Sequence, residues 1–230
     1  MLYRYFLFVY FLSAAALAQN LELPLASPVD AVNVYIIPTD DISEQASGGI
    51  ARALTKETGL WVKSTMWTPS NGIEPFPGTN QYAAEDYFPI GKAATQTLHE
   101  LSPRTYFIVL TNRDINSKTH NFRFQYSMHN PMANTSVLSL ARLQYDIDGS
   151  KSAPDIVVAR VAKMLIRIVG EMRMGWKRTN DPKDLMYAPI MSIEDIDRMD
   201  LSQTLQRRKQ QPLWPNLSLD TDATGRSTRL

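Results

Sequence analysis

The chain has 230 residues, with 24 lysines and arginines against 23 aspartates and glutamates and a formal net charge of +1. Because the positive and negative charges nearly cancel, they give no electrostatic argument for nucleic acid or an anionic membrane as a partner. The sequence has no cysteine, which excludes disulfides, thiolate zinc sites, a thiol nucleophile and a lipid-anchoring cysteine. The fold must therefore rest on its hydrophobic core.

Residues 1–18 have the composition of a secretory signal peptide. Arg4 precedes an apolar run from Phe6 to Ala18, which ends in the A-x-A cleavage site Ala16-Leu17-Ala18. The run is shorter than the roughly 20 residues that span a bilayer, which favours cleavage over the alternative of an uncleaved membrane anchor. We therefore expect a secreted or periplasmic protein that starts at Gln19 and is not held in the membrane. Without Arg4 the basic and acidic residues are equal in number.

The mature chain begins with a strand and a helix. Residues 32–37 (VNVYII) are β-branched and aromatic, as in a buried strand. Apolar residues then recur at helical spacing from Ile42 to Leu54, between possible N-cap groups at Thr39-Asp40-Asp41 and a glycine stop at Gly59.

The rest of the domain mixes strands and helices. Period-two alternation over Phe122 to Tyr126 predicts a strand with one face in water. The other expected elements are strands at 60–66, 105–110 and 137–143, a mostly helical stretch at 82–101 broken by Pro89, a long helix at 155–176, and a helix opened by a capping box at Ser192.

This order predicts an α+β fold: a single domain with a mixed, twisted sheet backed by helices. The predicted domain covers residues 19–206, and the polar, proline-punctuated segment 207–230 is expected to be a poorly ordered tail.

Four stretches then stand out in a fixed order along the chain: 105–114 (TYFIVLTNRD, ending in a T-x-x-D element), 121–124 (NFRF), 136–143 (SVLSLARL), and 160–200. Together they resemble the archaemetzincins, a family of metzincin-like zinc proteases. The resemblance implies a metzincin-like fold whose long helix is the active-site helix. A methionine-containing turn, the Met-turn, follows that helix, and Met186 and Tyr187 match it.

In such proteases the helix carries H-E-x-x-H-x-x-G-x-x-H, which supplies the zinc ligands and the general base. The first histidine falls on Arg167, the glutamate on Ile168, the second histidine on Glu171 and the third on Lys177. Gly175 stands one place later than the motif's glycine.

The resemblance therefore implies a degenerate active site. A catalytic zinc needs about three nitrogen, oxygen or sulfur ligands, whereas arginine and lysine offer no lone pair and Ile168 cannot take a proton. We predict that the chain binds no zinc, although the family would use it, and that it has no other cofactor and no peptidase activity. Arg167 and Glu171 are four residues apart, which predicts an ion pair across the vacant site. The alternative is an ordinary amphipathic helix with these residues on its wet face.

Other catalytic groups are not favoured. His120 and His129 bracket the predicted edge strand nine positions apart, an odd spacing that points them to opposite faces. Ser139 and Ser192 lie in no G-x-S-x-G elbow.

The sequence therefore predicts an exported, non-catalytic protein. We expect it to bind an extended peptide or protein by strand addition at the edge strand from Phe122 to Tyr126. Two alternatives stay open: an active peptidase or hydrolase with an atypical site, and a purely structural interaction domain.

Overall fold

The computed structural model describes residues 31–209 except 97, 99 and 121. The predicted signal peptide and residues 210–230 of the predicted tail lie outside the described residues. Among the described residues, no helix combines the length and the apolar character needed to cross a membrane.

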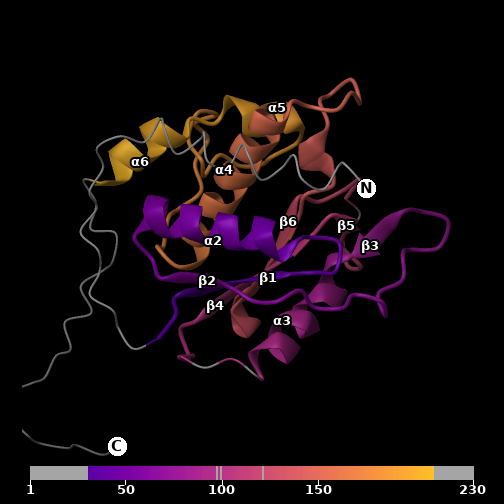
Figure 1. The fold of residues 1–230 in the computed structure, drawn as a ribbon. Helices are drawn as coiled ribbons and strands as arrows, with labels where there is room; N and C mark the ends of the chain where they lie inside the picture. Colours follow the sequence, from indigo (N-terminus) through magenta and orange to yellow (C-terminus); the bar gives the residue numbers. More distant parts are fainter. Residues whose placement is uncertain (1–30, 97, 99, 121, 210–230) are drawn as a thin grey trace, which may run out of the picture.

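A twisted five-stranded sheet with the order β2-β1-β4-β7-β6 forms the centre of the fold (Figure 1). Its strands are β1 (Val34–Pro38), β2 (Val62–Ser64), β4 (Tyr106–Thr111), β7 (Thr135–Ser139) and β6 (Ser127–Asn130). All neighbours are parallel except β6, which lies antiparallel to β7 at the edge. A parallel pair of short strands, β3 (Gln81–Ala83) and β5 (Asp114–Asn116), lies apart from this sheet.

Helices cover both faces of the sheet. On one face, α2 (Glu44–Thr58) and α4 (Pro154–Met172) pack with the sheet into the larger core cluster. On the other, the 3₁₀ turn η3 (Ala84–Tyr87) and α3 (Phe88–Thr95) enclose a smaller one (Figure 1). The predicted α+β fold, a single domain with a mixed sheet backed by the long helix, is confirmed.

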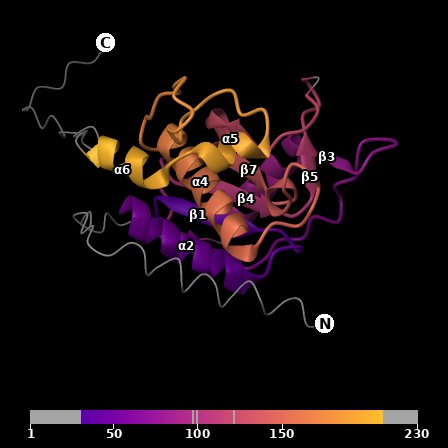
Figure 2. The ribbon, with the colours of Figure 1, turned by 90° about the horizontal axis from the view of Figure 1, so that it is seen from above.

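The closing helices lie on the α4 side. Figure 2 shows α4 between α2 and α5 (Ile193–Arg198), with α6 (Leu201–Lys209) beyond the end of α5. The capping box predicted at Ser192 is present, and Asp195 completes it. Helix α6 extends to Lys209, into the segment predicted as tail, and within it Arg207 pairs with Asp181 at 2.8 Å. Two short 3₁₀ turns, η4 (Pro131–Ala133) and η5 (Arg142–Gln144), complete the elements.

The predicted edge strand at 122–126 is wrong. The strand begins at Ser127, and before it only Gln125 forms an isolated bridge. Two of the three aromatic residues of that segment pack together: Phe124 lies edge-to-face on Tyr126, 5.3 Å between ring centroids, and the Arg142 guanidinium lies 4.2 Å from the Phe124 centroid. Phe122 is exposed. The alternation therefore predicted neither the strand nor the burial of all three aromatic side chains.

Two smaller expectations also needed correction. Pro89 lies in the first turn of α3, where a proline is tolerated, and so begins this helix instead of breaking it. The N-cap of α2 is Ser43, because Asp41 is already engaged by the Thr111 hydroxyl at 2.9 Å. The predicted stop at Gly59 is confirmed by its φ of 69°.

Candidate functional site

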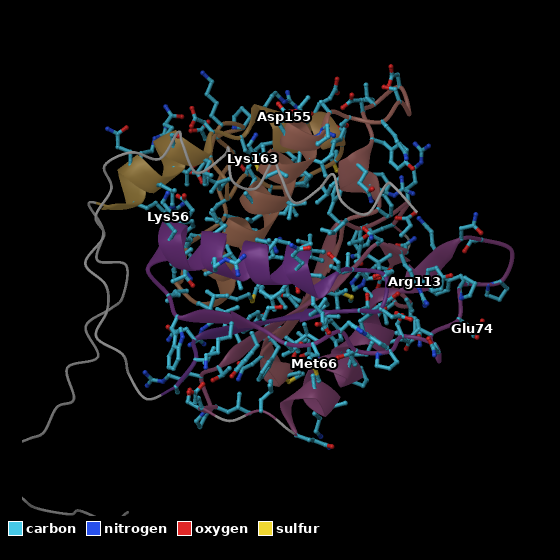
Figure 3. All side chains as sticks on the ribbon, in the orientation of Figure 1. Lys56, Met66, Glu74, Arg113, Asp155 and Lys163 are labelled. Carbon is cyan, nitrogen blue, oxygen red and sulfur yellow. The ribbon has the colours of Figure 1, made fainter. Side chains whose placement is uncertain are left out.

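Helix α4 begins at Pro154 and runs for 19 residues beneath the sheet. Its apolar face, with Val161, Leu165 and Ile168, packs into the core as predicted, and its polar face carries two buried arginines, Arg160 and Arg167. Arg160, only 2% exposed, binds Asp146 and Asp197 through its guanidinium. Lys163, labelled on α4 in Figure 3, donates to the carbonyl oxygens of Ile196 and Asp197. These contacts fix α5 and the 146–152 loop against α4.

Arg167 ties α4 to the Met-turn. Its Nη1 donates to the carbonyl oxygens of Leu185 at 2.5 Å and Tyr187 at 2.7 Å, on either side of the fully buried Met186. Burial lowers the pKa of Arg167, and the nearby Glu171 opposes that shift. Two protein carbonyls thus hold the side chain that falls on the first histidine position.

Glu171 pairs with Arg178, whose Nε lies 2.9 Å from Oε1. The predicted Arg167–Glu171 ion pair is not formed. The other oxygen, Oε2, is buried and has no hydrogen-bond partner among the described residues. Lys177 is exposed.

Arg178, and not Lys177, lies beside Glu171, and this arrangement has a local cause. After α4 the chain turns at Gly175, whose φ of 66° suits glycine. Trp176 then folds back onto Gly170, where an added Cβ would come within 2.1 Å of the indole. The backbone N–H of Trp176 also donates to the Gly170 carbonyl at 2.9 Å. This packing turns Arg178 toward Glu171. The displaced glycine was the sequence signal for it.

His129 is the residue that sequence reasoning underestimated. Its Nδ1 lies 2.7 Å from the Ser136 hydroxyl, which lies 2.9 Å from the Tyr106 hydroxyl. Burial lowers the pKa of His129 to about 4; Glu171 opposes this shift, and the charges of Arg178 and Arg167 add to it. The imidazole is therefore neutral at pH 7, and it lies close enough to Glu171, Arg178 and Arg167 for their charges to act on it. His120 instead contacts Thr119 and stacks on Phe122.

Arg167, Glu171, Arg178 and His129 form a cluster, and these four residues do not fit a catalytic zinc. Arg167 and Arg178 have no lone pair to donate, which leaves one carboxylate and one imidazole where about three ligands are needed. The part of the chain that the structure describes contains no group of three histidine, aspartate or glutamate side chains placed to hold a metal. Ile168, on which the motif's glutamate falls, is fully buried and has no group that could take a proton.

Three serines near the family-like segments are already engaged within the fold. Ser136 sits beside His129 but is fully buried, so its hydroxyl orients the imidazole and cannot reach a peptide bond. Ser139, also buried, donates to the Arg113 carbonyl at 2.7 Å. Ser192 is the N-cap of α5.

The outer edge of β6 presents open backbone groups. The Ser139 N–H donates to the Tyr126 carbonyl, and the register pairs His129 with Ser136. In an antiparallel pair, the residues of one strand alternately direct their backbone groups toward the partner strand and away from it. Since Tyr126 bonds β7, the N–H and C=O groups of Ser127 and His129 point away from β7. No strand of the described residues pairs with that edge. It lies beside the histidine of the cluster.

No family model and no curated protein matches the sequence. Among solved structures, the chain is similar to a zinc-dependent peptidase from Methanocorpusculum labreanum, with 15% identity, a TM-score of 0.58, and coverage of 75% of this chain and 99% of that one. It is also similar to archaemetzincin from Methanopyrus kandleri, with 18% identity, a TM-score of 0.54, and coverage of 80% and 99%. At these identities the likeness shows the fold, which is archaemetzincin-like, as the sequence resemblance predicted.

Proposed function

We propose that this chain is an exported, non-catalytic protein of archaemetzincin-like fold that binds an extended peptide or protein segment. One observation carries the proposal. The guanidinium of Arg167 stands where the family places a zinc-binding histidine, and the carbonyls of Leu185 and Tyr187 hold it there. A side chain fixed in this way supports the Met-turn and cannot ligate a metal.

The binding edge is β6, moved from the predicted segment at 122–126. Ser127 and His129 offer outward N–H and C=O groups, the pattern that receives an added strand. The strand is short, so main-chain pairing alone gives weak binding, and the neighbouring side chains must add to it. The hydroxyl beside the cluster histidine, that of Ser136, is fully buried, which does not favour the alternative of an active hydrolase.

The test combines cleavage with binding. The mature protein is incubated with a fluorescence-quenched peptide library, with and without added zinc, and its affinity for biotinylated degenerate hexapeptides is measured by biolayer interferometry. We expect binding and no cleavage in either condition. Reproducible cleavage would establish the hydrolase alternative, and absence of all binding would favour the structural one.

A matched pair of variants locates the binding edge. Ser127→Pro removes an outward-facing N–H, and a proline is tolerated at the first residue of an edge strand. It should weaken hexapeptide binding while the circular dichroism spectrum stays unchanged. Ser127→Ala keeps the N–H and should bind like the wild type. Equal affinities for both variants would exclude strand addition at β6.

A further inference from the structure

We propose that the site at β6 selects peptides that end in a free C-terminal carboxylate, which the guanidinium groups of Arg167 and Arg178 receive beside Glu171. This inference rests on the proposed peptide-binding function and names the class of peptide. It assigns a binding role to the cations that stand near the metal-ligand positions of the family motif.

Both guanidinium groups are only partly used by the protein. Arg167 donates through Nη1 alone, and its Nε and Nη2 have no hydrogen-bond partner among the described residues. Arg178 donates through Nε to Glu171, so both of its Nη groups are likewise without a described partner. Its side chain is 59% exposed and can be reached from solvent. A guanidinium fork matches a carboxylate in two parallel hydrogen bonds.

The charge of the cluster favours an anion. Arg167 and Arg178 are cations, Glu171 is the acid of the cluster, and His129 is held neutral by its burial. The charge of Asp184 also acts on Arg167, but Asp184 is paired with Arg207 and Arg208. The four groups therefore carry a net charge of about +1 at pH 7. A bound carboxylate would neutralise it in partly buried surroundings, where such an interaction is screened less than at an open surface.

Glu171 distinguishes a peptide end from other anions. Its Oε2 is buried and has no described hydrogen-bond partner, so a donor brought close to it would be favourable. The last residue of a peptide carries an N–H next to its carboxylate and offers a donor and an anion at once. A fully ionised phosphate offers an anion but no donor to offset the repulsion by Glu171.

The geometry of β6 brings a peptide to these groups. His129 and Ser136 form a directly opposed pair, and the Ser136 hydroxyl bonds Tyr106, a core residue on the α4 face of the sheet. The imidazole therefore points to the α4 face. A peptide strand added outside β6 would lie about 4.8 Å from it. Side chains and terminal groups of that peptide on the α4 face would then lie near Arg167, Glu171 and Arg178, whose charges act on His129.

The experiment compares two versions of one probe. A biotinylated degenerate hexapeptide pool made without Asp or Glu is synthesised with a free C-terminal carboxylate and again as the amide. We expect the amide to bind about tenfold more weakly, the factor that one lost charge-assisted hydrogen bond brings. Arg178→Gln, at an exposed position, should abolish the difference between the pools. Lys177→Gln, at the exposed neighbouring position without a role in the cluster, should preserve it.

The outcomes separate this inference from the proposed function. Equal binding of the two pools by the wild type, or equal weakening of both by Arg178→Gln, would overturn carboxylate selection while peptide binding stands. If neither pool binds, the peptide-binding function itself fails. A preference for the free carboxylate that disappears only in Arg178→Gln supports the inference.

Discussion

Replacing Arg167 by methionine tests whether this side chain now anchors the Met-turn. The side chain is 7% exposed and gives two hydrogen bonds, to the carbonyls of Leu185 and Tyr187. A hydrogen bond made by a charged group contributes about 1.5–3 kcal/mol, and a buried acceptor left without a donor costs about 1–3 kcal/mol. Relief from burying the charge offsets part of this loss. We expect Arg167→Met to lower the free energy of unfolding by about 2–4 kcal/mol.

The measurement is equilibrium unfolding in urea, followed by circular dichroism at constant pH. Lys177→Met is the matched control, because Lys177 is exposed and a surface change of this kind stays within about 0.5 kcal/mol. Methionine can stabilise a protein where it replaces a buried ion pair. Here the partners are main-chain carbonyls, which remain behind without a donor. An Arg167→Met variant as stable as the wild type would therefore refute the anchoring role.

Three further predictions concern pH, metal and export. The folded-state pKa of His129 is about 4, below the 6.5 of the free side chain. Its contribution to stability is therefore present above pH 6.5 and lost as the pH falls toward 4, and His129→Gln should flatten that part of the urea-midpoint profile. The purified protein should contain no stoichiometric zinc by elemental analysis, and a chelator should leave its Tm unchanged. The triple variant Arg167→His, Glu171→His, Arg178→His should bind zinc in calorimetry. If the triple variant binds zinc no better than the wild type, the inferred geometry is wrong. Intact-mass measurement from the native host should give a chain starting at Gln19, and a full-length mass in the membrane fraction would contradict export.

Elements specified by local signals were predictable from the sequence. The buried strand β1, the glycine stop of α2 at Gly59 and the capping box at Ser192 each depend on residues within a few positions. The active-site-type helix was also predictable, although it ends at Met172 because the turn at Gly175 follows.

Contacts between distant segments were not predictable from the sequence. Alternation over 122–126 predicted a strand there, but β7 pairs with Ser127–Asn130 instead, and Phe122 is exposed. His129 was set aside for its odd spacing from His120, although its hydrogen-bond partner is Ser136 on β7. The register of β6 and β7 brings these two residues together. The packing of α4 under the sheet places the charge of Glu171 within range of the imidazole.

Glu171 pairs with the residue next to the one that the motif singles out. The motif assigned the third ligand to Lys177, which is exposed. Trp176 packs on Gly170 after the turn at Gly175, and Arg178 lies beside Glu171. The result is a cluster in which one arginine supports the Met-turn from below and the other stays exposed at 59%. A metal would have used all of these positions for ligation, whereas two guanidinium groups leave donors to spare. Those spare donors, beside a carboxylate oxygen without a described partner, are the observations on which the proposed recognition of a peptide carboxylate rests.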